Sequence, residues 1–174
     1  MDDKEGKHSV PATLVLGLGN PLRGDDGVGV CVARMLAEGS LPADVEVVDG
    51  GTQGLGLVSL LEGRRRAIVV DAAHVGRAPG EFVRFRLEEA RLPGEEEAGF
   101  SVHEAGLREA LLLAQALGIL PGEVIFFGVQ PAHVEWEAGL SPQVEAALPR
   151  LAEAVQAEAL AGSQTPAEGR HGEQ

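Results

Sequence analysis

Residues 14–29, LVLGLGNPLRGDDGVG, join an apolar run to a glycine-rich turn that carries two adjacent carboxylates. The apolar run predicts a buried strand over 13–18, and the spacing of apolar residues from Val28 onward predicts an amphipathic helix. Strand, turn and helix in this order are typical of an α/β protein. The turn holds Asp25 and Asp26, and such a pair of negative charges is stabilised by a helix N-terminus or a metal ion.

The same alternation of strand and helix patterns continues along the chain. Further buried strands are expected at 45–49, 67–70 and 124–129. In residues 81–87, apolar side chains alternate with arginines, which predicts an antiparallel edge strand with one face in water. Helical patterns follow at 55–61, 107–117 and 142–155. We therefore expect an α/β fold: a three-layer α/β/α sandwich around a mainly parallel five-stranded sheet with one antiparallel edge strand.

Composition indicates one domain and excludes several function classes. The chain has 174 residues, 44% of them hydrophobic, which suffices for a single core over 13–160. Residues 1–12 are expected to be flexible and 161–174 disordered. A net charge of −13 argues against nucleic acid or an anionic membrane as partner. No apolar targeting segment is seen, so we expect a cytoplasmic location. A monomer is the expected oligomeric state. The single cysteine, Cys31, excludes an internal disulfide and is interpreted as a packing residue.

Candidate site residues fall where the predicted parallel strands end. Asp26 follows the first strand, and Asp71 ends the third. His103 lies in the capping-box signature Ser101-Val-His-Glu104, which predicts the first turn of a helix. Ligands of open α/β sheets gather at the carboxyl ends of the strands, so these three side chains are expected to converge. The helix dipole keeps a histidine at that place neutral, which is the form that binds a metal.

Each candidate also has a purely structural interpretation. Asp25 is expected to cap the first helix, and Asp26 could be a second acid that stabilises the helix dipole. Asp71 could form a salt bridge with one of the arginines at 64–66. His74 could be an accessory metal ligand, but we interpret it as a solvated loop residue.

Other glycine-rich motifs do not fit the chain. The third glycine of a dinucleotide fingerprint that starts at Gly17 would fall at position 22, which is Leu22. No Gly-Lys-Ser/Thr phosphate loop and no G-x-S-x-G nucleophile elbow occur. The two carboxylates and the histidine therefore remain the main candidate for chemistry.

The chain resembles the hydrogenase maturation endopeptidases, which remove the C-terminal extension from the large subunit of nickel-iron hydrogenases. The matching segments occur in the family's order and are Gly17-Leu-Gly-Asn-Pro-Leu-Arg-Gly-Asp-Asp-Gly-Val-Gly29, Asp49-Gly-Gly-Thr52, Val70-Asp-Ala72, Ser101-Val-His-Glu104, Gly128-Val-Gln-Pro131 and Leu140-Ser-Pro142. The resemblance implies a protease that acts on the precursor after nickel insertion and recognises the bound nickel.

The resemblance also assigns roles to residues. It implies that Asp26, Asp71 and His103 are the metal-binding and catalytic positions. Two carboxylates and one imidazole leave open positions on a nickel ion. We expect the nickel to come with the precursor, whose thiolates complete the site, so that the free chain is empty or holds a surrogate divalent cation.

Small and polar residues beside this site are expected to receive the substrate. Gly50, Gly51 and Thr52, together with Gly27, are predicted to line a groove for the extension because glycine lets a peptide approach closely. Asn20 is predicted to order the loop around Asp26 through bonds to the backbone. Two other functions stay open: a nickel chaperone or checkpoint protein that does not cut, and a small-molecule metallohydrolase on the same scaffold.

Overall fold

A computed structural model of the chain describes residues 10–89 and 105–163. Within them, one five-stranded sheet has the strand order β2-β1-β3-β5-β4. The strands are β1 (Thr13–Leu18), β2 (Val45–Gly51), β3 (Arg66–Ala72), β4 (Phe82–Arg86) and β5 (Glu123–Val129). The pairs β1–β2, β1–β3 and β3–β5 are parallel and β4–β5 is antiparallel, so the predicted sheet and its antiparallel edge are confirmed.

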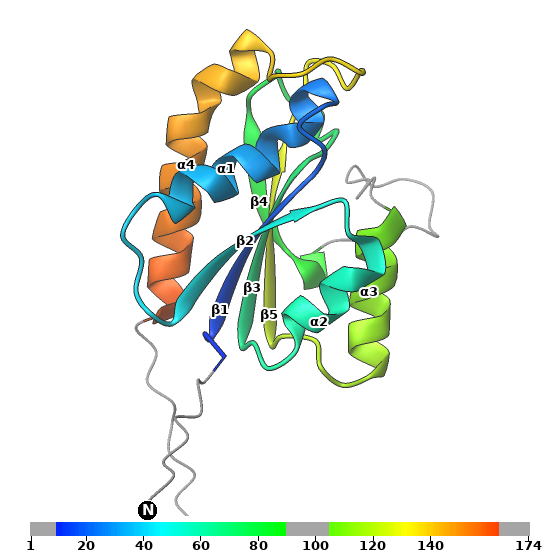
Figure 1. Ribbon diagram of the computed structural model, residues 1–174, viewed down its shortest axis with the longest axis vertical. Helices are drawn as coiled ribbons and strands as arrows, with labels where there is room; N and C mark the ends of the chain where they lie inside the picture. Colours follow the sequence, from blue (N-terminus) through cyan, green and yellow to red (C-terminus); the bar gives the residue numbers. More distant parts are fainter. Residues whose placement is uncertain (1–9, 90–104, 164–174) are drawn as a thin grey trace, which may run out of the picture.

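Helices cover both faces of the sheet (Figure 1). They are α1 (Val28–Ala37), α2 (Leu57–Leu61), α3 (Ala105–Ala116) and α4 (Pro142–Ser163), with 3-10 turns η1 (Gly24–Gly27), η2 (Gly54–Gly56) and η3 (Leu87–Glu89). α1 and α4 pack on the face that carries Ile68 and Val70, whereas α2 and α3 pack on the face that carries Ala67 and Val69. This is the expected three-layer sandwich. In the described part of the chain, no helix is both long and apolar enough to cross a bilayer.

The element bounds differ from the predictions at a few ends. β3 continues to Ala72, so Asp71 lies inside the strand and pairs with Gly128 instead of ending the strand. α4 reaches Ser163, which takes it into the segment expected to be disordered. The predicted capping box at 101–104, with His103, lies outside the described residues.

Two glycines let α1 lie directly on the centre of the sheet. A side chain at Gly29 would collide with the carbonyl oxygens of Val70 and Leu18, and one at Gly17 would collide with the carbonyl oxygen of Gly29. Backbone therefore packs on backbone at this point, which only glycine allows. The contact fixes the start of α1, and with it the carboxylate turn of η1, against β1 and β3.

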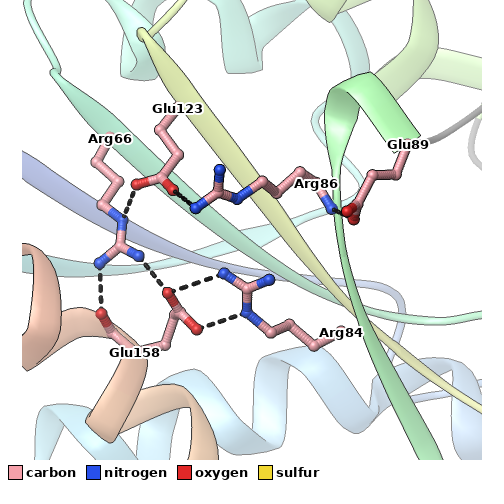
Figure 2. A network of polar contacts seen from close by, with 6 residues as sticks. All are labelled: Arg66, Arg84, Arg86, Glu89, Glu123 and Glu158. Atoms are coloured by element: carbon pink, nitrogen blue, oxygen red, sulfur yellow. Dashed lines mark hydrogen bonds and ion pairs between the residues drawn. The ribbon is translucent and has the colours of Figure 1, made fainter.

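A network of charged side chains holds the opposite end of the sheet to α4 (Figure 2). Arg66, which is buried at the start of β3, contacts Glu158 of α4 and forms a 2.6 Å ion pair with Glu123. Arg84 binds the same Glu158 at 2.6 Å, and Arg86 binds Glu123 at 3.0 Å. The arginines predicted for the wet face of β4 therefore join three strands to a helix, far from the carboxyl ends of the strands.

Candidate active site

A cleft opens at the carboxyl ends of the parallel strands and has a volume of about 330 Å³. Three segments that are distant in sequence form its walls: the turn around η1, the residues after β3 and the residues after β5. The lining residues are Arg23, Asp26, Ala72, Ala73, His74, Pro131 and Val134. Asp26, predicted from the sequence, therefore faces a concave surface of a size suited to a few peptide residues.

The loop before η1 orients Asp26 through short hydrogen bonds. The backbone N–H of Asn20 donates to Oδ2 of the Asp26 carboxylate at 2.9 Å, and the side-chain oxygen of Asn20 accepts from the N–H of Leu22 at 3.0 Å. The carbonyl of Asn20 accepts from the N–H of Arg23 at 2.9 Å. The side chain of Asn20 thus bonds the backbone of this loop as predicted, and its part in substrate binding stays a prediction. Asp26 itself is half-buried, and one of its oxygens is held while the cleft gives access to the group.

Asp71 is a buried carboxylate on the neighbouring strand, with 8% of its surface exposed. Its side chain points to the opposite sheet face from those of Val70 and Ala72, which is the face that α3 covers. There it borders a small cavity of about 20 Å³ together with Leu107 of α3, Phe126 and Gly128. Burial of a carboxylate among such apolar neighbours is costly unless a hydrogen-bond donor or a cation compensates for it.

The structural interpretation of Asp71 was a salt bridge to one of the arginines at 64–66. Arg64 and Arg66 do not form it, because each pairs with other residues. Arg64 bonds the side chain of Glu46 and the carbonyl of Pro11. Arg66 is engaged in the charge network at the start of β3. At about 3.3 Å per strand residue, that end lies about 17 Å from Asp71.

Asp25 does not cap the first helix, contrary to the prediction. The residue before α1 is Gly27, and no side chain of the described residues caps that helix. The fully buried Asp25 carboxylate instead accepts hydrogen bonds from the N–H groups of Ala132, His133 and Ser141 and from the Ser141 hydroxyl, at 2.6–3.3 Å. Asp25 lies inside η1 with its side chain turned toward the interior, so it binds the segment between β5 and α4.

The third predicted ligand, His103, lies outside the described residues. Among the described residues, no three histidine, cysteine, aspartate or glutamate side chains gather as a metal site. Asp26 and Asp71 border two cavities that share Ala73 as a lining residue.

The start of α3 lies close to His103 in the sequence, because α3 begins at Ala105, two residues after it. Its Gly106 lies so close to Gly54 of η2 that a side chain would collide with the Gly54 backbone.

The predicted substrate-binding residues Gly50 and Gly51 end β2, and Thr52 follows directly. Gly50 is buried, and a Cβ there would lie 2.7–2.8 Å from the terminal carbons of Leu16 and Leu18, so these two leucines pack against the glycine. Gly51 has a φ of 49°, in the left-handed region that favours glycine, and its carbonyl accepts from Gly19 at 3.0 Å. Thr52 is exposed. The role of these residues in substrate binding stays a prediction.

Gly27 serves internal packing. A side chain at this position would meet the backbone of Pro21 at 2.6 Å. Because Gly27 has no Cβ, the turn that carries Asp26 can pack closely against Pro21.

The sequence did not place two of the residues that line the cleft. His74, interpreted as a solvated loop residue, is exposed but lines the cleft with Asp26, and its Nδ1 lies 3.3 Å from the side-chain nitrogen of Gln130. Arg23 lies within the motif that carries the resemblance, and its guanidinium carbon stands 5.6 Å from the ring centroid of Trp136. The sequence signal that could have indicated this contact was the single arginine in the glycine-rich turn together with the single tryptophan of the chain.

Cys31 takes no part in the cleft. It is half-buried on α1, and burial raises the pKa of its thiol above the ordinary value. The reactive thiolate is therefore disfavoured at neutral pH, in agreement with its interpretation as a packing residue.

Comparison with known proteins identifies the family. A family model described as HycI, hydrogenase maturation protease, matches residues 30–158. The chain belongs to the hydrogenase maturation protease family. This family member is 36% identical over 135 residues to the hydrogenase 2 maturation protease of Escherichia coli, an alignment that covers 76% of the chain and 81% of that protein.

Other similar proteins agree with this family. The hydrogenase expression/formation protein HupD of Rhodobacter capsulatus is 40% identical to this family member over 134 residues. That alignment covers 75% of the chain but only 63% of the relative, so the chain spans less than two thirds of its length. Among solved structures, the hydrogenase maturating endopeptidase HybD from Escherichia coli superposes with a TM-score of 0.74 at 33% identity, covering 87% of this chain and 93% of that one.

Proposed function

We propose that this hydrogenase maturation protease is an endopeptidase that removes the C-terminal extension of a nickel-iron hydrogenase large-subunit precursor after nickel insertion. We further propose that it recognises the nickel already bound in the precursor. The nickel is then part of the substrate, and the precursor is the protein partner. The cytoplasm, where such a precursor would be met before export or assembly, is the proposed location.

One observation carries the proposal: two carboxylates reach the same end of the sheet from neighbouring parallel strands. Asp26 follows β1 and faces the cleft, and Asp71 lies near the end of β3. Asp26 borders one cavity and Asp71 another, and Ala73 lines both. His103, two residues before α3, is the proposed third ligand. Carboxylate oxygens and an imidazole nitrogen are donors that nickel accepts.

The residues present would divide the work as follows. Asp26 and Asp71 would bind the precursor's metal through their carboxylates, with Asn20 fixing the orientation of Asp26 by its 2.9 Å hydrogen bond. A bound nickel would supply Lewis acidity toward the scissile carbonyl or toward a water. The half-buried position of Asp26 at the cleft would let a peptide bond come beside the metal, whereas Asp71 is buried among apolar neighbours.

The proposed function is tested by incubating the full chain with a large-subunit precursor prepared with and without nickel. We expect a shortened large subunit and a released C-terminal fragment, both identified by mass, only from the nickel-loaded precursor. Equal cleavage without nickel would contradict recognition of the metal. No cleavage with either form would contradict the protease function and favour a chaperone or checkpoint role.

A further inference from the structure

Arg23 is the only arginine or lysine among the described residues that line the cleft. Its guanidinium lies over the ring of Trp136, with 5.6 Å between the guanidinium carbon and the ring centroid. The buried Nε atom has no hydrogen-bond partner among the described residues. A guanidinium carries five N–H donors in a rigid plane. Because Nε is buried, the donors that Arg23 offers to a ligand in the cleft are its terminal N–H groups.

The loop that carries Trp136 is held in place by several hydrogen bonds. Trp136 lies in the loop between β5 and α4, which the buried carboxylate of Asp25 ties to η1 through Ala132, His133 and Ser141. The N–H of Gly24 also donates to the carbonyl of Glu137, next to Trp136, at 2.6 Å. The loop backbone is therefore anchored, and a planar cation that is already stacked on an aromatic ring loses less side-chain entropy when it binds a ligand.

Trp136 itself is 78% exposed, the largest exposure among the large hydrophobic side chains of the described residues. It is also the only tryptophan of the chain. Tryptophan and arginine are the residues most enriched at the points of protein interfaces that contribute most binding energy. A tryptophan left in water beside a cleft, with an arginine on its face, is therefore typical of a binding surface for a peptide.

The charge of the cleft decides which peptide atoms Arg23 would bind. Asp26 lies on the same wall, so an acidic ligand would gain from Arg23 but be repelled by this carboxylate and by the net charge of −13. A neutral main chain avoids that repulsion. It also offers a carbonyl oxygen at every residue, so an extended segment that lies along the cleft brings at least one acceptor to the guanidinium.

We propose that Arg23, stacked on Trp136, is a substrate-binding residue that donates hydrogen bonds to main-chain carbonyl oxygens of the precursor's C-terminal extension. The inference rests on the proposed function only in naming the extension as the ligand. Arg23 holds the peptide beside Asp26 and takes no part in bond cleavage. Its removal therefore weakens binding of the precursor and leaves the turnover of the bound complex intact.

The test compares steady-state cleavage of nickel-loaded precursor by the wild-type chain, Arg23→Gln and the matched control Arg77→Gln. Arg77 is an exposed arginine of the turn after β3 that does not line the cleft. We expect Arg23→Gln to raise KM about tenfold with kcat within about twofold of wild type, as for the loss of uniform binding. Arg77→Gln should match wild type. An unchanged KM, or a loss confined to kcat, would overturn the proposal.

A second pair of variants tests the stack without touching Arg23. Trp136→Phe keeps an aromatic face and should keep KM within about threefold of wild type, whereas Trp136→Leu should raise KM in the same direction as Arg23→Gln. Equal KM values for both variants and the wild type would show that the stack has no role.

Failure of the proposed function would be distinguishable from failure of this inference. If the wild-type chain leaves the nickel-loaded precursor uncut, the same variants are compared by their dissociation constants for that precursor. Weaker binding by Arg23→Gln and Trp136→Leu than by Arg77→Gln would then support the binding role of Arg23. Equal dissociation constants would reject it, whatever the chain does to the precursor.

Discussion

The buried carboxylate of Asp25 accepts two hydrogen bonds from Ser141, one from its backbone N–H at 2.6 Å and one from its hydroxyl at 2.8 Å. Ser141 in turn caps α4, because its carbonyl accepts from Glu145 at 2.8 Å and its hydroxyl oxygen lies 3.4 Å from the N–H of Val144. The turn after the first strand is thereby joined to the start of the last helix. The wall of the cleft between them depends on this contact.

Asp25→Ala should destabilise the protein by about 3 kcal/mol or more, because each buried donor left without an acceptor costs about 1–3 kcal/mol. Asp25→Asn keeps one acceptor oxygen and should cost less. The free energy of unfolding from urea titration checks both, with Glu135→Gln, an exposed acid of the same loop, as control. A midpoint for Asp25→Ala equal to that of the control would show that the contact contributes nothing to stability.

Gly29→Ala should destabilise the fold, although alanine normally stabilises a helix relative to glycine by about 1 kcal/mol. The added methyl group would collide with the carbonyl oxygens of Val70 and Leu18 and push α1 off the sheet. We expect a loss of about 2 kcal/mol or more, in the range of overpacked cores. The matched control is Gly39→Ala just after α1, where the nearest atom would lie at 3.4 Å. A melting temperature of Gly29→Ala at or above wild type would refute the close packing.

Glu158→Gln should weaken the attachment of α4 to the sheet. It removes the charge that Arg66 and Arg84 share, and Arg66 is buried. Loss of one partner from a fully buried ion pair costs about 3–5 kcal/mol, and because Glu123 still pairs with Arg66 we expect about 2 kcal/mol at neutral pH. Denaturant unfolding measures the difference. A value below about 0.5 kcal/mol would show that the network is energetically neutral.

The same network predicts a pH dependence. Hydrogen bonds from Arg84, followed by the charges of Arg66 and Arg84, lower the pKa of Glu158 below its ordinary value of 4.5. A carboxylate with a lowered pKa in the folded state stabilises the protein above its unfolded pKa and loses this contribution as pH falls through the folded pKa. The stability difference between wild type and Glu158→Gln should therefore shrink below pH 4.5. A difference that stays constant down to pH 2 would contradict this assignment.

The sequence predicted most of the sheet because its signals are local. The apolar run at 13–18 coincides with β1, and the alternation of Val83 and Phe85 with arginines identified the antiparallel edge. The end of β3 was placed too early because an acid interrupts the apolar run at Asp71, although the strand continues to Ala72.

Contacts between distant segments were not predictable in this way. The partners of Asp25 lie 107–116 positions along the chain, so a local pattern favoured a helix cap instead. The contact of Arg23 with Trp136 was not predicted for the same reason, because the two residues are far apart in the sequence. Asp26 reached a cleft as its position after the first strand indicated, whereas the role of His103 stays a prediction because the residue lies outside the described part of the chain.

The central claim is that Asp26 and Asp71 act together on the precursor's metal. It is tested most directly by the rate at which Asp26→Asn and Asp71→Asn shorten a nickel-loaded large-subunit precursor, followed by mass. Glu62→Gln, an exposed acid after α2, is the control, and the unfolding midpoint of each variant shows that it is folded. We expect at least a hundredfold loss for both aspartate variants and none for the control. Wild-type rates for a folded Asp26→Asn or Asp71→Asn would contradict the account.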